Sequence, residues 1–336
     1  MKLKELGEFG LIERLQRGCL VRPEGVVRAI GDDAAVFETD GGQVTLLTTD
    51  LLIERVHFLR QAISGEDLGH KALAVNLSDI AAMGAEPREA FVSIAVPPDC
   101  SITFLEQIYN GMRALARRHQ VNILGGDTTT SRRDLVINVA LTGRADPRQV
   151  LFRDGARVGD VICVTGPLGD SRAGLQMILA GRTPDDDHSR RLHQRHVRPE
   201  PHLAQGRLLA ASGAVTAAID LSDGLLSDLG HVARQSGVGA VVHADQVPIS
   251  PALAHFCRQT GPPAIDLALG GGEDYVLLVT VKPDAVTRLS ASFASVIKSP
   301  LYAIGELVAG EGVRVLAASG DDLKISTTSW DHFKEQ

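Results

Sequence analysis

Acidic and hydroxyl side chains occur in this sequence at positions where they could bind a metal ion together. The motif Gly31-Asp32-Asp33 has the composition of a turn, and its two adjacent aspartates can converge on a cation. Thr48-Thr49-Asp50 ends a run of strand-forming residues, so Thr48 and Asp50 share one face and both offer oxygen to a hard cation. Taken alone, the first motif is also explained by ordinary turn chemistry and the second by a cap at the end of a strand.

A helix predicted from Gly65 to Met83 carries the most informative carboxylate. Its alanine and leucine content predicts packing on several sides, yet Asn76 and Asp79 lie one turn apart within it. Burying an unpaired carboxylate costs several kcal/mol, so Asp79 should have a metal ion or a cationic partner. Because Lys71 and Asp79 lie on the same row of the helix, a structural ion pair between them is the alternative to a metal site.

Three glycine-containing motifs add further acidic groups. Gly125-Gly126-Asp127-Thr128-Thr129 follows a predicted strand, and its glycines let a ligand approach the backbone closely. Asp220-Leu221-Ser222-Asp223-Gly224 ends a strand and opens a helix, where an N-cap formed by Ser222 or Asp223 is the alternative explanation. Gly270-Gly271-Gly272-Glu273 leads into a strand, and its three glycines also suggest a nearby ligand.

The donor atoms of these motifs are all oxygen, which favours Mg²⁺ over Zn²⁺. Mg²⁺ is normally bound through a few carboxylates together with substrate phosphates, so the motifs predict a site for phosphorylated substrates. A zinc site is the alternative for one histidine-rich segment, although its spacing matches no zinc-binding helix motif. That segment contains His188, His193, His196, Glu200 and His202.

Charge and composition narrow the class of ligand. Lys plus Arg is 34 and Asp plus Glu is 41, and the resulting formal net charge of -7 has the wrong sign for binding a nucleic-acid backbone. Aromatic residues make up only 4%, so stacking platforms for single-stranded nucleic acid are not expected. The phosphate-binding loop G-x-x-x-x-G-K-[ST], a strand-linked G-x-G-x-x-G and the protein-kinase motifs are absent. An acidic protein would therefore have to attract phosphates through bound cations.

The sequence also predicts the cellular compartment of the protein. The N-terminal segment carries three glutamates and lacks the apolar core of a secretory signal. No apolar run approaches the length of about 20 residues that a membrane span needs. We therefore expect a cytoplasmic protein with neither a membrane nor a nucleic-acid partner. The cysteines show no C-x-x-C spacing, which fits reduced thiols, and they are Cys19, Cys100, Cys163 and Cys257.

These motifs need a scaffold, and hydrophobic periodicity predicts alternating strands and helices of an α/β or α+β fold. The length of 336 residues favours two domains, and a turn-rich segment at 144–147 places the boundary near residue 148, giving domains 1–148 and 149–336. Predicted strands are 42–50, 89–96, 121–124, 135–143, 161–165, 215–220, 240–243, 275–281 and 301–307. Predicted helices are 65–83, 103–119, 172–180, 225–235, 252–260 and 284–293, whereas 183–189 is predicted to be a solvated loop.

Taken together, the motifs resemble those of the thiamine-monophosphate kinase family. The likeness extends from Gly7 to the segment at Trp330 and includes GDDAAVF, TTDLLIERVHF, KALAVNLSDIAAMGAEP, GGDTT, FRDGARVGD, TGPLGDS, RHVRPEP, IDLSDGLLSDLGH and GGEDYVLL. The resemblance implies an aminoimidazole-ribonucleotide synthetase-like fold, with an N-terminal α/β domain whose strands pair across a homodimer into a β-barrel and a C-terminal α+β domain. It also implies a reaction in which ATP and thiamine monophosphate give ADP and thiamine diphosphate, with several Mg²⁺ ions as cofactors.

The resemblance assigns roles to individual positions as well. The implied magnesium ligands are Asp33, Thr48, Thr49, Asp50, Asp79, Asp127, Asp220 and Asp223. The implied nucleotide contacts are Tyr109, Gly126, Asp127, Arg153 and Ser222, and the implied contacts to thiamine monophosphate are His57, Glu273 and Trp330. Apart from the resemblance, His57 would be an ordinary hydrogen-bonded polar residue and Arg153 a member of a surface ion pair.

The residues and the resemblance agree on a mechanism. Two polyanions must meet, and bound Mg²⁺ would cancel their mutual repulsion. We expect direct in-line transfer of the γ-phosphoryl group without a phospho-enzyme, and no general base, because the acceptor phosphate oxygen is largely anionic at neutral pH.

Two other classes of protein stay open at this point. One is a member of the same superfamily with a different acceptor, such as an amidine-forming synthetase or selenophosphate synthetase. No reactive cysteine lies in a glycine-rich N-terminal segment, which weighs against the second of these. The other class is a non-catalytic module that binds Mg-ATP without turnover.

Overall fold

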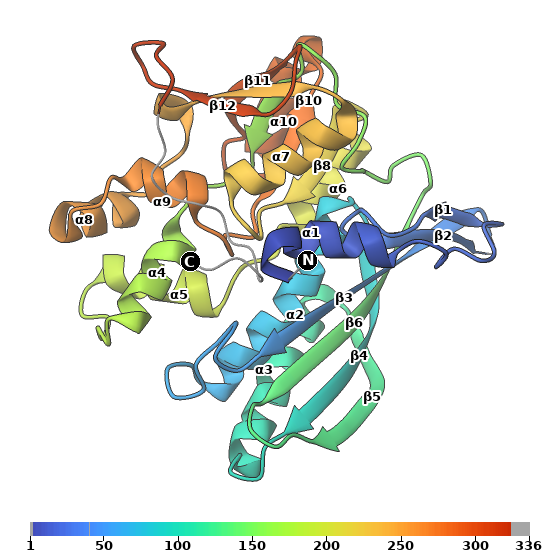
Figure 1. Ribbon diagram of the computed structural model, residues 1–336, viewed down its shortest axis with the longest axis vertical. Coiled ribbons are helices and arrows are strands. Elements are labelled where there is room, and N and C mark those ends of the chain that lie inside the picture. The colour runs from blue at the N-terminus through green and yellow to red at the C-terminus, as the bar shows by residue number, and fades with distance from the viewer. Residues whose placement is uncertain (1–2, 40, 324–336) are drawn as a thin grey trace.

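The chain forms two six-stranded sheets, one from residues 26–145 and one from residues 161–316, with helices packed between and around them (Figure 1). The computed structural model describes residues 3–39 and 41–323. In the first sheet, which has the order β1-β2-β3-β6-β4-β5, only the pair β4 and β5 is parallel. Its strands are β1 (Val26–Arg28), β2 (Ala35–Thr39), β3 (Gln43–Ile53), β4 (Glu86–Val96), β5 (Asn122–Thr130) and β6 (Val136–Ala145).

The second sheet has the order β12-β9-β11-β7-β10-β8 and is antiparallel except between β12 and β9. Its strands are β7 (Val161–Val164), β8 (Val215–Asp220), β9 (Gly239–His243), β10 (Leu277–Val281), β11 (Tyr302–Val308) and β12 (Val313–Leu316). The helices of this half are α4 (Asp170–Leu179), α5 (Asp187–Val197), α6 (Leu203–Ala211), α7 (Leu225–Ser236), α8 (Pro251–Thr260), α9 (Ala264–Gly270) and α10 (Val286–Ile297), and α1 (Leu3–Leu15) precedes the first sheet.

Helix α2 (Gly65–Ala82) lies between the two sheets and is buried on nearly every side, as its alanine and leucine content predicts. It contacts β3 and β6 of the first sheet and β8 of the second. The hydroxyl of Ser64 caps its first turn by accepting the N–H of Asp67 at 3.1 Å. Gly69 lets α3 (Ile102–His119) cross closely, because a Cβ there would lie 1.8 Å from the carbonyl oxygen of Ile108. Side chains of α2 can therefore reach the space between the sheets.

The predicted loop at 183–189 is partly wrong, because α5 begins inside it at Asp187. Asp186 accepts the N–H of Ser189 at 2.6 Å, and the Ser189 hydroxyl closes a reciprocal capping box. The segment is so polar that its periodicity is weak, and its short apolar stripe consists of Leu192 and Val197. That stripe is enough to dock α5 against its neighbours in the second half of the chain.

The strands that carry two of the motifs run further than predicted. β3 continues through Thr48-Thr49-Asp50 to Ile53, where it pairs with β6. β5 continues through Gly125-Gly126-Asp127 to Thr130, where it pairs with β4. Glycine and aspartate are disfavoured in strands, so at Gly125-Gly126-Asp127 hydrogen bonds with the neighbouring strand hold the chain extended.

The first sheet is open within one chain, and the implied β-barrel is not closed among the described residues. Helices α2 and α3 cover one face of this sheet (Figure 1). Large apolar side chains are exposed elsewhere on the sheet, among them Leu47, Leu51, Phe91 and Leu124. Exposed apolar groups gathered on one sheet are typical of a surface that another protein covers.

Among the described helices, none combines the length and the apolar character that crossing a membrane requires.

Candidate active site

A pocket of about 730 Å³ lies between the two halves of the molecule. Its walls come from β3 and the segment 51–63, from α2, α4 and α5, from the end of β8, and from the glycine-rich loop 270–275. The predicted site residues that line it are Asp33, Thr48, Thr49, Asp50, His57, Asp79, Arg153, Asp220, Ser222, Asp223 and Glu273. Folding therefore gathers most of the predicted site from both halves of the chain.

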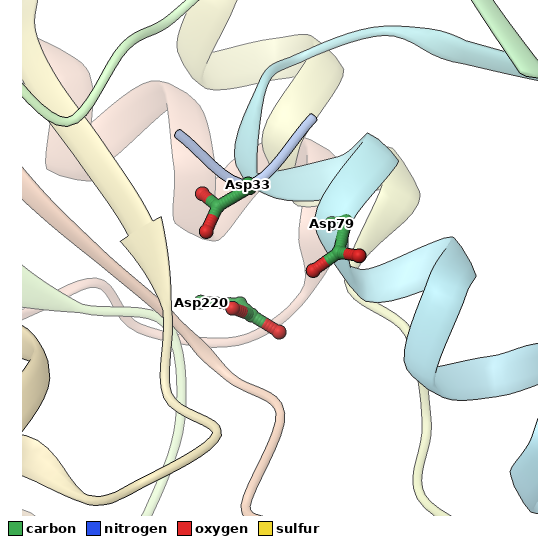
Figure 2. A group of neighbouring side chains, drawn as sticks. All are labelled: Asp33, Asp79 and Asp220. Carbon is green, nitrogen blue, oxygen red and sulfur yellow. The ribbon is translucent and has the colours of Figure 1, made fainter. Parts of the chain in front are cut away.

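Three carboxylates converge in this pocket. Asp33 precedes β2, Asp79 lies on α2 and Asp220 ends β8, and Figure 2 shows their side chains around one space. Each offers one oxygen, and these oxygens all lie within 4.8 Å of one another. Such a group of oxygen donors on three separate elements fits a hard divalent cation.

The electrostatics of these carboxylates also fit a cation site. Burial raises the pKa of Asp79 well above its ordinary value and that of Asp220 to about 8, and neighbouring carboxylates add to both shifts. The pKa of Asp50 is raised to about 6 by burial and by the charge of Asp33. Like charges held this closely favour protonation, whereas a bound cation would favour the ionised carboxylates.

The two carboxylate oxygens of Asp33 differ in their hydrogen bonding. Its Oδ1 accepts a hydrogen bond from Nε of Arg153 at 2.9 Å, whereas its buried Oδ2 has no hydrogen-bond partner among the described residues. A buried carboxylate oxygen of this kind needs a partner, and a metal ion would supply one. The side chain of Arg153 is 19% exposed and points into the pocket wall, so the alternative of a surface ion pair is wrong.

Hydroxyl groups orient the other two carboxylates. Thr48 Oγ1 donates to Oδ2 of Asp79, and Ser78 Oγ donates to Oδ2 of Asp220 at 2.6 Å. Ser78 belongs to α2 and Asp220 to β8, so this bond ties the two halves together at the site. The alternative of an ion pair between Asp79 and Lys71 is wrong, because Lys71 Nζ pairs with Oε1 of Glu273 at 2.9 Å.

Asp228 is a site residue that the motif analysis missed. It is buried in the pocket wall, and its Oδ2 accepts the N–H groups of Asp223 and Gly224 at 3.2 and 3.0 Å. The alternative explanation of this motif, an N-cap by Ser222 or Asp223, is wrong, since Gly224 occupies the N-cap position of α7 without a side-chain bond. An acidic residue in the first turn of the predicted helix was the signal that could have identified Asp228.

The loop that carries Glu273 is held in an unusual backbone conformation. Glu273 has a φ of 63° and Tyr275 a φ of 50°, both in the left-handed region that non-glycine residues rarely adopt. The N–H of Glu273 donates to the carbonyl of Ser222 at 2.7 Å, and that of Tyr275 to the carbonyl of Leu221 at 2.9 Å. The loop is thus fastened to the segment that carries Ser222 and Asp223.

His57 and Trp330 are the other two residues implied to contact thiamine monophosphate, and only His57 can be located in the structure. His57 lies in the pocket wall, and its Nδ1 accepts the N–H of Ile53 at 3.0 Å. This hydrogen bond is the one expected of an ordinary polar residue, and it still leaves the ring at the pocket surface. Trp330 lies outside the described residues.

Three implied nucleotide contacts lie away from the pocket of their own chain. Tyr109 packs from α3 against the core of the first sheet, and Gly126 and Asp127 are exposed on β5. In the sheet register Asp127 pairs with Ser93, Ser93 with Asn138, and Asn138 with Leu51 of β3. Three strand spacings separate Asp127 from β3, which is about 14 Å. Asp127 therefore does not join the cluster of Asp33, Asp79 and Asp220 within one chain.

The histidine-rich segment does not converge on one point. His202 Nδ1 lies 2.7 Å from the hydroxyl of Thr165, and His188 stacks on His255 with ring centroids 4.7 Å apart. In the part of the chain that the structure describes, the one group of three metal-ligating side chains is that of Asp33, Asp79 and Asp220. The zinc alternative therefore has no support here.

Both halves of the chain match models of one protein family. Residues 31–145 match the model of the AIR synthase related protein, N-terminal domain. Residues 157–317 match that of the AIR synthase related protein, C-terminal domain.

The chain is also similar over nearly its whole length to individual proteins. It is 36% identical over 333 residues to a thiamine-monophosphate kinase of Aquifex aeolicus, covering 99% of this chain and 100% of that protein. It is 38% identical over 331 residues to a thiamine-monophosphate kinase of Salmonella typhimurium, covering 97% and 98%. A solved structure described as AaThiL complexed with AMPPCP and TMP matches with a TM-score of 0.87 at 36% identity, covering 99% of each chain.

Proposed function

The chain belongs to the thiamine-monophosphate kinases of the AIR synthase-related family, and we propose that it phosphorylates thiamine monophosphate to thiamine diphosphate with ATP. The observation that carries this proposal is the convergence of Asp33, Asp79 and Asp220 in a pocket between the two halves. A phosphate donor and a phosphate acceptor repel each other, and such a site would let both bind to an acidic protein.

The proposed magnesium ligands are centred on this cluster. Its all-oxygen donors and the buried, unpartnered Oδ2 of Asp33 fit Mg²⁺. When bound, Mg²⁺ would neutralise phosphate charge and favour an in-line arrangement of donor and acceptor. The full set that we propose is Asp33, Thr48, Thr49, Asp50, Asp79, Asp220 and Asp223 from one chain, with Asp127.

The remaining residues of the pocket bind and orient the substrates in this proposal. Arg153 is held by Asp33 beside the cluster and can contact a phosphate of ATP, and Ser222 lies on the loop opposite. His57 and Glu273 contact thiamine monophosphate, and Trp330 is retained as a proposed contact from the family resemblance. Loop 270–275 and the segment 51–63 form walls that would limit the access of water.

The chemical step needs no general base from the protein. An anionic oxygen of the thiamine monophosphate phosphate attacks the γ-phosphorus, the bond from that phosphorus to the β,γ-bridging oxygen breaks, and ADP leaves with the electron pair. Catalysis then rests on positioning and on charge stabilisation, which Arg153 and the Mg²⁺ held by the buried carboxylates would provide.

We also propose that two copies of the chain pair through their first sheets and that β5 completes the site of the partner. Two observations support this assembly: Leu47, Leu51, Phe91 and Leu124 are exposed, and Asp127 lies about 14 Å from β3 of its own chain. Tyr109 and Gly126 would then contact nucleotide bound mainly by the partner.

Two further proposals concern organisation and location. We place the domain boundary between residues 148 and 149, in the interval between the two matched family models. We propose a cytoplasmic location, which four free cysteines support.

Product analysis tests the proposed function. Purified protein is incubated with ATP, Mg²⁺ and thiamine monophosphate, with free thiamine and other monophosphates as parallel acceptors. Thiamine diphosphate and ADP should form in equal amounts, and a chelator should stop the reaction. Turnover with another acceptor only, or binding of Mg-ATP without turnover, would contradict the proposal and favour one of the other two classes.

A further inference from the structure

We propose that Lys71 and His196 are positioning residues that hold the Glu273 carboxylate ready for the positively charged organic part of thiamine monophosphate. The inference rests on the proposed function and assigns a recognition role to side chains outside the predicted metal and nucleotide sites.

Three elements meet at Glu273. Lys71 of α2 places Nζ 2.9 Å from Oε1, and His196 of α5 places Nδ1 3.3 Å from Oε2. Lys71 is 1% exposed and His196 is buried, whereas 24% of the Glu273 side chain remains exposed towards the pocket. Each carboxylate oxygen thus has a partner from a different helix, which fixes the plane of the carboxylate.

Glu273 stays ionised in this arrangement. Burial acts to raise its pKa, but the charge of Lys71 and its contact with the carboxylate lower the pKa below its ordinary value. His196 is itself neutral, because burial lowers its pKa to about 3. A neutral ring next to a carboxylate carries its one proton on Nδ1, and this nitrogen lies 3.3 Å from Oε2 of Glu273 and 3.1 Å from Oγ of Ser171.

The charge of Glu273 decides which part of the substrate it can meet. An ionised carboxylate repels a phosphate, so Glu273 cannot contact the phosphate of thiamine monophosphate directly. The remaining part of that molecule has a cationic thiazolium ring and an aminopyrimidine with N–H donors, and both are complementary to a carboxylate.

The pocket has separate ends for the two parts of the substrate. Lys71 and Asp79 are eight residues apart on α2, which places them about 12 Å apart along the helix axis. The metal cluster lies at the Asp79 end and Glu273 at the Lys71 end. Apolar side chains of Leu175 and Val197, close in sequence to Ser171 and His196, line the pocket and suit the faces of the two rings.

Lys71 is therefore expected to act through Glu273 and not on a phosphate. Glu273 is the one partner that Lys71 has among the described residues. If Lys71 were removed, the Glu273 carboxylate would be left buried without its cation, and it would rotate or take up a proton.

A double-mutant cycle tests this dependence. Glu273→Gln, Lys71→Met and the double variant K71M/E273Q are compared for KM of thiamine monophosphate, KM of ATP and kcat. Each single variant should raise KM for thiamine monophosphate about tenfold and leave KM for ATP within about twofold. The double variant should be no worse than E273Q alone, because Lys71 has nothing left to position. Effects that multiply in the double variant would show that Lys71 contacts the substrate itself and would overturn the inference.

A second pair of variants tests His196 while controlling for its packing. His196→Asn places an amide N–H where Nδ1 stands, and His196→Leu removes the donor but fills the space. H196N should retain most of the affinity for thiamine monophosphate, and H196L should lose about tenfold. Equal losses in both variants, with unchanged melting temperatures, would contradict the positioning role. Failure of the proposed function is separate, because the wild-type protein would then form no thiamine diphosphate at all.

Discussion

Helix α2 and strand β5 both carry an aspartate that the sequence predicts to bind Mg²⁺, but they lie in opposite environments. Asp79 belongs to a helix buried between two sheets, and its neighbours supply hydroxyls and two further carboxylates. Asp127 belongs to an exposed strand, about 14 Å from β3. Similar motifs thus lie either within the carboxylate cluster of one chain or well away from it.

The difference also concerns what holds each motif in place. The position of Asp79 is fixed by side chains packed around α2, whereas that of Asp127 depends on backbone pairing with β4. Gly126 shows how tight that pairing is, since its φ is 148° and a Cβ there would lie 1.7 Å from the carbonyl oxygen of Val92.

The largest expected effect is on activity. Asp79→Asn and Asp127→Asn should each lower kcat by about 10²–10³, because each removes a carboxylate that would hold the Mg²⁺ needed to neutralise the developing phosphate charge. Steady-state product formation measures the loss, and Asp187→Asn is the matched control because its carboxylate is 98% exposed outside the pocket. Full activity in D127N would show that Asp127 on β5 takes no part in catalysis, and the comparison of the two aspartates would then fail.

The next effect is on stability and separates the two environments directly. Leu77→Ala in α2 should lower the free energy of unfolding by about 2–5 kcal/mol, because Leu77 is fully buried. Leu124→Ala on β5 should cost less than about 1 kcal/mol within a single chain, because that side chain is 60% exposed. Chemical denaturation measures the first effect, and sedimentation at low protein concentration shows whether Leu124→Ala instead weakens the proposed dimer.

A smaller effect should appear in the pH dependence of stability without Mg²⁺. Burial and nearby carboxylates raise the pKa of Asp220 to about 8, so the folded state binds more protons than the unfolded chain between about pH 4 and 8. Stability should therefore fall as pH rises through this range, by on the order of 1–2 kcal/mol between pH 6 and 8.

Thermal unfolding at several pH values measures this dependence, with Asp220→Asn as the comparison variant. The variant should flatten the profile, and Mg²⁺ should stabilise the wild-type protein more at pH 8 than at pH 6. A stability that rises with pH in the absence of Mg²⁺ would mean that the carboxylates are already neutralised by protein groups.

Local sequence patterns predicted the scaffold well where periodicity was strong. The helix predicted from Gly65 to Met83 runs from Gly65 to Ala82, because its Ser64 cap and its glycine and proline stop are local signals. The helix α5 was missed because only Leu192 and Val197 mark its buried stripe. The extra length of β5 comes from pairing with β4, which the propensities of Gly125, Gly126 and Asp127 do not encode.

The candidate site was predictable in its residues but not in its contacts. Acidic residues at a turn, in a packed helix and at the end of a strand indicated Asp33, Asp79 and Asp220, and the fold brings these three together. The pairing of Lys71 with Asp79 was wrong because eight residues of helix span about 12 Å, which is too far for an ion pair. The actual partner, Glu273, is distant in sequence, so the pair can be found only when the tertiary fold is known.

The central claim is that each site combines α2 of one chain with β5 of its partner, and mixed dimers test it most directly. D79N and D127N proteins carrying different tags are mixed, allowed to exchange subunits and assayed for thiamine diphosphate. We predict recovery to about a quarter of the wild-type activity, because half of the dimers are mixed and each has one site with neither substitution. Mixed dimers, isolated through both tags, that remain as inactive as their parents would show that both aspartates serve the same chain's site and would contradict the claim.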